Sequence, residues 1–230
     1  MTPLVLIPGM MCDGRLWRGI DARLPRRTIV HAPVTEAERV EDLAALVLAA
    51  APPRFALAGL SMGGIVAMEI VRQAPERVEG LALLDTNPRA EAPEMAARRQ
   101  PQIDRALAGG LAAVMRDELK PNYLAPGPGK TPILDLCLEM ALGLGPAVFA
   151  RQSRALRDRP DQQATLAAFR GPALVLMGEQ DRLCPLERHA LMHRLMPQSR
   201  LAVIPGAGHL PTLEQPDATL DELALWLEAC

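Results

Sequence analysis

Six short runs of apolar residues predict buried β-strands along the chain. They span residues 4–7, 28–31, 55–58, 81–84, 173–177 and 201–204. The runs are continuous rather than alternating, which is the pattern of parallel strands covered on both faces. Segments with helical periodicity lie between most of them, at residues 16–24, 40–50, 62–73, 186–195 and 218–228. This alternation predicts an α/β fold with right-handed crossovers and a doubly wound, mostly parallel, six-stranded sheet.

The interval from residue 86 to residue 170 breaks this alternation, because it contains no convincing strand. Its helical stretches span residues 95–107, 111–119, 133–142, 147–156 and 162–169. We expect prolines to interrupt these helices, namely Pro101, Pro121, Pro126, Pro128, Pro132, Pro146 and Pro160. We interpret residues 86–170 as a helical lid (cap) inserted into a core made of residues 1–85 and 171–230. Such a lid would cover the carboxyl edge of the sheet, where α/β folds bind ligands.

Composition narrows the possible classes of function. The chain has 230 residues, of which 49% are apolar, so it is long enough for one globular domain. Its formal net charge of −2 gives no reason to expect binding to nucleic acid or to an anionic membrane. No apolar run approaches the roughly 18 residues that span a bilayer. The four cysteines are scattered without a Cys-x-x-Cys pair, which predicts reduced thiols and a cytoplasmic protein.

A serine flanked by glycines follows the third predicted strand, in the sequence Gly59-Leu60-Ser61-Met62-Gly63. Gly-x-Ser-x-Gly alone fits either a nucleophile on a strained turn or a small residue in a tight connection. Gly59 and Gly63 would let the strand and the following helix approach closely. The N–H of Met62 would lie in the first helical turn, where it has no intrahelical partner and could bind a developing anion.

A second donor for such an anion is predicted after the first strand. The chain must turn sharply at Pro8-Gly9, and the N–H of Met10 would then point toward the same sheet edge as Ser61. The alternative interpretation of Met10 is a plain turn residue. We favour Met10 as an oxyanion donor, since one such donor typically contributes about 10²–10³ in rate.

A serine hydroxyl needs a base, and the chain offers four histidines. His209 lies in the glycine-rich sequence "IPGAGHLP" after the last strand, which favours it as the base. His31 ends the second strand and is interpreted as structural. His189 and His193 have the i, i+4 spacing of a metal pair, but no third ligand is evident, so we expect an exposed helix face and no metal site.

The histidine in turn needs an acid to fix its tautomer. Asp181 follows the predicted strand 173–177, whereas Asp85 follows the strand 81–84, and the chain order Ser, Asp, His fits both. We favour Asp181 because it lies in a turn-rich loop on the connection before His209. Asp85 remains the alternative acid.

Taken together, these residues resemble the α/β-hydrolase superfamily, in its branch of small lidded serine esterases, lactonases and C–C hydrolases. The matching sequences are "LVLIPGM", "GLSMGG", "LVLMGEQDRLCP" and "GAGHLP", which occur in the family's order. The resemblance implies Ser61 as nucleophile, His209 as base, Asp181 as acid, and the N–H groups of Met10 and Met62 as the oxyanion hole. This chain has Pro8-Gly9 where the family commonly has His-Gly, and it begins at the family's third strand.

The function predicted from these residues is hydrolysis of a carboxylic ester or lactone through an acyl-enzyme, without a metal or organic cofactor. The same triad also serves C–C bond hydrolases, thioesterases and perhydrolases, and a small-ligand receptor with slow hydrolysis remains a further alternative. The expected partner is a small ester-like molecule, and the sequence carries no signal for the oligomeric state. Arginines of the 86–170 segment, among them Arg98, Arg99, Arg151 and Arg154, are interpreted as a solvated helix face rather than as ligands of a substrate carboxylate.

Overall fold

A computed structural model describes residues 1–127 and 129–230, so Pro128 lies outside the described residues. Within them, six strands form one sheet in the order β2-β1-β3-β4-β5-β6. Every neighbouring pair is parallel, which makes the sheet all-parallel rather than mostly parallel. The strands are β1 (Leu4–Ile7), β2 (Ile29–His31), β3 (Phe55–Leu60), β4 (Val78–Leu84), β5 (Ala173–Gly178) and β6 (Arg200–Ile204). All six predicted strands are therefore confirmed, with ends that shift by at most three residues.

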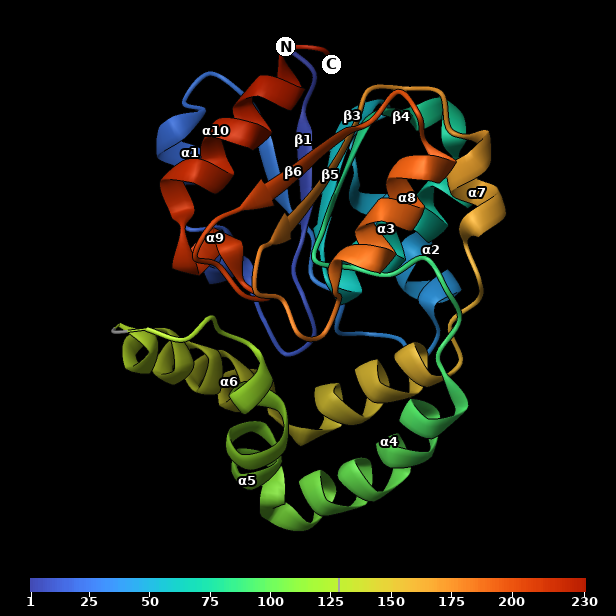
Figure 1. Cartoon of the computed structure of the whole chain (residues 1–230). Coiled ribbons are helices and arrows are strands. Elements are labelled where there is room, and N and C mark those ends of the chain that lie inside the picture. Colours follow the sequence, from blue (N-terminus) through green and yellow to red (C-terminus); the bar gives the residue numbers. More distant parts are fainter. Residues whose placement is uncertain (128) are drawn as a thin grey trace.

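Helices cover both faces of the sheet, as Figure 1 shows. One face carries α2 (Val40–Ala50), α3 (Met62–Gln73), α7 (Gln163–Ala168) and α8 (Leu186–Leu195). The other carries α1 (Ile20–Arg23), α9 (Pro211–Glu214) and α10 (Pro216–Leu227). Two short 3₁₀ helices add η1 (Gly14–Trp17) and η2 (Pro75–Arg77). The single helix predicted at residues 16–24 is wrong, because Gly19 has a left-handed backbone (φ 88°) that separates η1 from α1.

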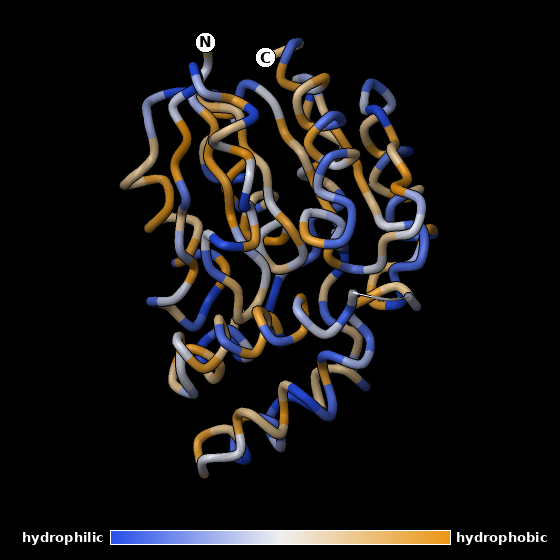
Figure 2. The backbone as a smooth tube through the Cα atoms, turned by 90° about the vertical axis from the view of Figure 1, so that its left-hand side faces the viewer, coloured by the Kyte–Doolittle hydropathy of each residue, from blue (hydrophilic) through white to orange (hydrophobic). Residues whose placement is uncertain are grey.

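Each face of the sheet buries its own apolar cluster. Alternate residues of one strand point to opposite faces, so Val5 and Ile7 join the cluster under α2 and α3, whereas Leu4 and Leu6 join the cluster under α1 and α10. Figure 2 shows the resulting pattern, with apolar colour concentrated along the central strands and mixed colour on the outer helices. This two-sided burial explains why the strands read as continuous apolar runs in the sequence.

The chain between β4 and β5 is helical and forms a separate layer below the carboxyl ends of the strands (Figure 1). It comprises α4 (Pro93–Arg105), the π-helical η3 (Ala106–Gly110), α5 (Leu111–Ala113), the π-helical η4 (Val114–Leu119), η5 (Lys120–Asn122) and α6 (Lys130–Arg157), whereas α7, the last helix of this interval, packs with α3 and α8 on the face of the sheet. These helices share a small apolar cluster that includes Ile103, Met115 and Phe149. Met11, from the loop after β1, packs into the same cluster and joins this layer to the sheet.

Two proline predictions in this layer are wrong. Pro101 lies inside α4 and does not end it, since the helix continues to bury Ile103. Pro132 lies in the first turn of α6, where a missing N–H costs no intrahelical bond. Pro146 does interrupt the helical geometry, because α6 bends at Gly145 (φ 83°, ψ 171°) directly before it. The predicted helices 133–142 and 147–156 are thus the two arms of one bent helix.

The bent helix α6 differs from the expectation that no apolar segment of the chain is long enough to span a bilayer. It is the one helix among the described residues that is long and apolar enough to cross a membrane by length and composition. Its bend and its packing do not fit a straight membrane-spanning helix. Side chains from both arms, such as Met140 and Phe149, are fully buried against the rest of the chain. A kinked helix that contributes buried side chains to three apolar clusters is typical of a core or covering helix in a folded domain.

Candidate active site

The site lies where the order of the sheet reverses. β1 pairs with β2 on one side and with β3 on the other, so the connections that leave β1 and β3 run to opposite faces of the sheet. Open α/β sheets bind ligands at the carboxyl ends of strands at such a switch point. Ile7 at the end of β1 is in register with Gly59 of β3, which brings Met10 and Ser61 to the same edge.

Ser61 sits on the turn between β3 and α3 in a backbone conformation that non-glycine residues rarely adopt (φ 55°, ψ −115°). Such a conformation costs about 1–3 kcal/mol and persists only where neighbours hold it. Here the Ser61 N–H donates to the carbonyl of Leu84 (2.9 Å), and the Ser61 carbonyl accepts from Gly64 N–H (3.0 Å) and the Thr86 hydroxyl (2.7 Å). The strand β4 beside it therefore fixes the serine.

Gly59 and Gly63 are required by the close approach of β3, α3 and β1. A Cβ on Gly59 would lie 2.3 Å from the Gly63 carbonyl oxygen. A Cβ on Gly63 would lie 2.1 Å from the carbonyl oxygen of Ile7. Real Cβ atoms do not make contacts this short, so no larger residue fits either position without moving backbone. The close packing predicted from the two glycines is present.

His209 reaches Ser61 from the loop after β6. Its Nε2 lies 2.9 Å from Ser61 Oγ, and its ring is almost fully buried. The loop is held by Glu214, whose carboxylate accepts the N–H groups of Gly208 (2.9 Å) and Leu210 (3.1 Å). The His209 N–H donates to the carbonyl of Tyr123 (2.7 Å), in the helical layer. Neither anchor could be predicted from the sequence, because Glu214 lies five residues further on and Tyr123 belongs to another layer.

Asp181 completes the chain of contacts. Its Oδ2 lies 2.9 Å from His209 Nδ1, and its Oδ1 accepts the N–H groups of Leu183 (2.8 Å) and Cys184 (3.1 Å). Burial favours a higher pKa for this carboxyl, but the charge and hydrogen bond of His209 and the two backbone donors lower its pKa to about 2. An ionised carboxylate can only accept, so Nδ1 carries the ring proton and Nε2 is free to accept from Ser61.

Asp85, the alternative acid, is also buried at this edge but does not contact the histidine. It follows β4 with a left-handed backbone (φ 45°), and its Oδ1 accepts the N–H of Gly178 (2.9 Å). Its Oδ2 has no donor among the described residues. Burial and the negative charge of neighbouring Asp181 raise the pKa of Asp85 well above its ordinary value. The same burial and neighbouring charge favour the protonated form of Asp85 beside the carboxylate of Asp181.

The two backbone donors predicted for an oxyanion face the same cavity as Ser61. Met10 and Met62 both line it, and neither N–H has a hydrogen-bond partner in the described part of the chain. A third residue fixes the loop that carries Met10. Gln152 on α6, fully buried, accepts the N–H of Met11 (2.8 Å) and donates to the carbonyl of Val34 (2.9 Å). Met11 itself has a left-handed backbone (φ 56°). The role of Gln152 could not be predicted from the sequence, because it depends on tertiary contact alone.

One set of potential metal ligands overlaps this arrangement. The ligand atoms of Asp181, Cys184 and His209 lie within 4.8 Å of one another. Both ring nitrogens of His209 are already hydrogen-bonded, and burial raises the pKa of the Cys184 thiol far above its ordinary value, which disfavours the thiolate that binds metals. The chemistry of these donors therefore fits a hydrogen-bonded triad better than a metal centre.

The other histidines differ in part from expectation. His189 is fully buried rather than exposed, and burial lowers its pKa to about 4, so it is neutral. His193 is partly buried and lies 2.8 Å from the Ser199 hydroxyl. The exposed face predicted for these two residues is wrong, since α8 packs this side of the helix against β5 and β6.

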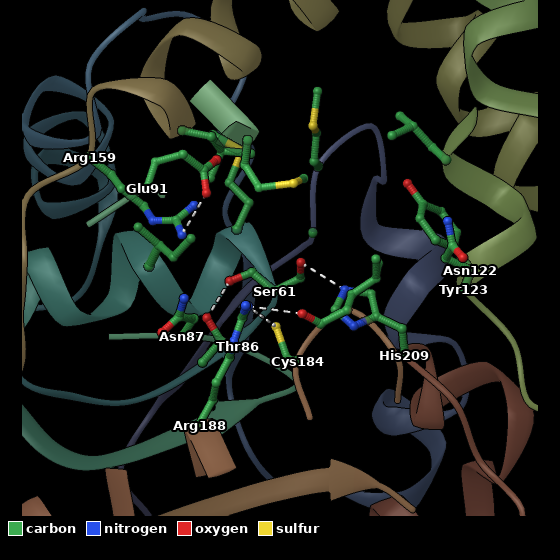
Figure 3. Close-up of a pocket in the computed structure, with 18 of the residues that line it drawn as sticks. Ser61, Thr86, Asn87, Glu91, Asn122, Tyr123, Arg159, Cys184, Arg188 and His209 are labelled. Carbon is green, nitrogen blue, oxygen red and sulfur yellow. Dashed lines mark hydrogen bonds and ion pairs between the residues drawn. The ribbon is translucent and has the colours of Figure 1, made fainter. Parts of the chain in front are cut away.

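A cavity of about 500 Å³ opens onto Ser61 and His209. Its apolar wall comes from the core and from the helical layer and includes Leu60, Met62, Ile65, Met95, Leu119 and Leu156. Figure 3 shows Ser61 and His209 side by side, with Arg188 and the Arg159–Glu91 pair on the other side of the serine. A hydroxyl, an imidazole and a carboxylate in hydrogen-bonded series, beside two backbone donors in a partly apolar cavity, are the parts needed for acyl transfer.

Comparison with known proteins agrees with this geometry. The model of an alpha/beta hydrolase family matches residues 4–222. The chain is similar to a pimeloyl-[acyl-carrier protein] methyl ester esterase of Pectobacterium carotovorum subsp. carotovorum, with 28% identity over 99% of this chain and 95% of the relative. It is similar to a thermophilic esterase from Thermogutta terrifontis solved with malate bound, with 27% identity, a TM-score of 0.90 and coverage of 99% and 90%.

The enol-lactonase from Burkholderia xenovorans LB400 shares the fold at 19% identity, with a TM-score of 0.84 and coverage of 99% and 92%. The matched segment contains every strand of the sheet and all five predicted site residues, from Met10 to His209. On its sequence, its all-parallel sheet and the connections that carry its site, the chain belongs to the α/β-hydrolase family.

Proposed function

We propose that the protein is a serine hydrolase that cleaves a carboxylic ester or lactone through an acyl-enzyme. The observation that carries the proposal is the unbroken series from Asp181 through His209 to Ser61, with both contacts at 2.9 Å. The relatives named as esterases support the same reaction class. Residues 86–170, proposed as the lid over the core of residues 1–85 and 171–230, close the cavity from the side opposite the sheet.

The first half of the reaction follows from the positions of these groups. His209 Nε2 takes the proton of the Ser61 hydroxyl as Oγ bonds to the carbonyl carbon of the ester. The negative charge on the former carbonyl oxygen is held by the N–H groups of Met10 and Met62, in the oxyanion hole. Asp181 stabilises the imidazolium that forms and keeps its orientation. His209 then gives the proton to the leaving alcohol, and the acyl group stays on Ser61.

The second half returns the enzyme to its starting state. A water molecule gives a proton to His209 and attacks the acyl carbon, and the same two N–H groups hold the charge again. The bond to Ser61 breaks, its oxygen recovers the proton, and the carboxylic acid leaves. The chemistry uses only side chains and backbone groups of this chain. The four cysteines are all free, which supports a protein that works in the reducing cytoplasm.

Turnover of p-nitrophenyl butyrate by the wild type and by a Ser61→Ala variant tests the proposal. Loss of the nucleophile should lower kcat by roughly 10³ or more. Ser199→Ala is a matched control, because Ser199 also contacts a histidine, His193, at 2.8 Å but lies outside the cavity. A loss below about tenfold in Ser61→Ala, or an equal loss in Ser199→Ala, would overturn the assignment.

A further inference from the structure

The cavity at Ser61 is strongly positive although the chain as a whole is slightly acidic. Three glutamates line it, Glu91, Glu118 and Glu187. Twice as many arginines line it, namely Arg89, Arg98, Arg99, Arg159, Arg182 and Arg188. The formal net charge of the whole chain is −2, so the lining of this cavity is more positive than the chain as a whole. A partly apolar cavity lined by one sign of charge focuses the potential on a ligand of opposite sign.

Two of these arginines form a buried group with a net positive charge. Arg159 donates to Glu91 at 3.0 Å, and Arg99 pairs with the same carboxylate, so two guanidinium groups share one acid. The side chains of Arg159 and Glu91 are only 7% and 6% exposed. Arg159 is also held by the carbonyl of Arg89 (3.0 Å). Two cations on one anion in a buried wall leave one positive charge without a carboxylate partner, which is costly unless a ligand supplies it.

Arg188 is the second cation without an acid. Its Nη1 donates to the carbonyl of Leu183 (2.9 Å) and lies 4.0 Å from Cys184 Sγ. Among the described residues, no carboxylate lies within 4.0 Å of its guanidinium. It occupies the first turn of α8, where a positive side chain opposes the helix dipole. Helix stability therefore does not explain an arginine at this position.

Both groups line the same cavity as the reacting serine. Leu183 and Cys184, which Arg188 touches, are the residues whose N–H groups bind the Asp181 carboxylate. Figure 3 shows Arg188 entering the cavity beside Ser61, and the Arg159–Glu91 pair on the same side of the serine, opposite His209. A substrate that places its carbonyl at Ser61 and extends toward this side meets a planar guanidinium fork, which matches a carboxylate in two hydrogen bonds.

We infer that the substrate is an ester or lactone with a second, ionised carboxylate, which Arg188 binds with support from the Arg99–Glu91–Arg159 group. The apolar residues that line the same cavity fit a short hydrocarbon chain between the two acid functions. This inference rests on the proposed esterase function and adds the class of acid that the site accepts. It also changes the interpretation of Arg99, which belongs to the cavity wall, whereas Arg151 and Arg154 contact Thr35 and Glu38 elsewhere.

The test compares kcat/KM for monomethyl adipate and methyl hexanoate, which have the same chain length and differ in a terminal carboxylate. We expect the wild type to prefer the monoanion by about tenfold or more. Arg188→Gln should lower kcat/KM for monomethyl adipate by about ten- to hundredfold, the size of a charge-assisted hydrogen bond, and change that for methyl hexanoate by less than about threefold. Arg188→Lys should recover part of the loss, since it keeps the charge but loses the fork.

Arg194→Gln is the matched control, because Arg194 lies on the same helix, is exposed and does not line the cavity. A wild type that prefers methyl hexanoate, or an Arg188→Gln variant that loses both activities equally, would overturn the inference. Competitive inhibition by inorganic phosphate as strong as that by adipate would also overturn it, because the site would then take any anion. If methyl hexanoate is hydrolysed through Ser61 without a preference for the monoanion, the esterase function stands and this inference alone fails. If neither ester is hydrolysed, the proposed function fails as well.

Discussion

Replacing Asp181 with asparagine should abolish most turnover, whereas the same change at Asp85 should leave it nearly intact. His209 Nδ1 lies 2.9 Å from Asp181 Oδ2 and donates to it. An amide at this place presents either an oxygen or an NH₂ group to the ring. The NH₂ group would force the ring proton onto Nε2, which could then no longer accept the proton of Ser61. Loss of the correct tautomer costs about 10⁴ in kcat in such triads, or about 5 kcal/mol of transition-state stabilisation.

Asp85→Asn changes much less, because asparagine reproduces the contacts of a protonated carboxyl. Its amide oxygen can accept the N–H of Gly178, now 2.9 Å from Asp85 Oδ1, and its NH₂ group can donate toward Asp181. The left-handed backbone at this position (φ 45°) also suits asparagine. We expect kcat within about threefold of the wild type, which corresponds to a smaller change in free energy than the loss of one ordinary hydrogen bond.

The two variants also differ in stability. The folded pKa of Asp181, about 2 against an ordinary 3.8, contributes about 2 kcal/mol of folding free energy above pH 4, which is lost as pH falls toward 2. Asp181→Asn should lose this contribution at neutral pH. The pKa of Asp85 is raised, so its contribution is present below pH 3.8 and is lost as pH rises. Asp85→Asn should therefore gain stability relative to the wild type as the pH is raised from 4 to 8.

Initial rates with p-nitrophenyl butyrate at 25 °C, together with thermal unfolding of the same samples by circular dichroism, separate loss of chemistry from loss of fold. Near-wild-type turnover by folded Asp181→Asn would refute the tautomer argument. A larger loss in Asp85→Asn than in Asp181→Asn would give the role of the acid to Asp85. A relative stability of Asp85→Asn that stays constant between pH 4 and pH 8 would show that the pKa of Asp85 is not raised in the folded state.

Two further changes test the packing around the site. Gly63→Ala should lower the free energy of unfolding, measured by urea denaturation, by about 2 kcal/mol or more, because its Cβ would lie 2.1 Å from the Ile7 carbonyl oxygen. Gly143→Ala is the control, because its Cβ would meet nothing within 4 Å, and it should be neutral or stabilising. Gln152→Leu should destabilise by about 1–3 kcal/mol by leaving the buried Met11 N–H without an acceptor. It should also lower kcat, since this hydrogen bond fixes the loop that carries Met10, the proposed oxyanion donor. An unchanged kcat would reduce Gln152 to a purely structural residue.

The sheet could be predicted from the sequence because its signals are local. A strand covered on both faces must be apolar at every position, so each strand stands out as a short continuous run. The helices α2, α3 and α8 also have the predicted bounds, since helical periodicity is a local signal. The glycines at positions 59 and 63 marked the close approach that the backbone requires.

The helical layer was harder to predict because tertiary packing overrides local preference there. A proline removes one hydrogen bond, but burial of Ile103 and its neighbours keeps α4 continuous through Pro101. The anchors of the site were invisible for a related reason. Gln152 and Glu214 act through backbone groups that are distant in sequence or belong to another element, and nothing in their local sequence distinguishes them from other polar helix residues.

The most direct test of the central claim is to identify the residue that a fluorophosphonate probe modifies in the folded protein. The account predicts one phosphonyl adduct, located by mass spectrometry on the hydroxyl of Ser61, with loss of esterase activity in proportion to labelling. The Asp181→Asn variant should label far more slowly, because its histidine no longer activates the serine. An adduct on another residue, or full esterase activity in a protein fully labelled at Ser61, would contradict the account.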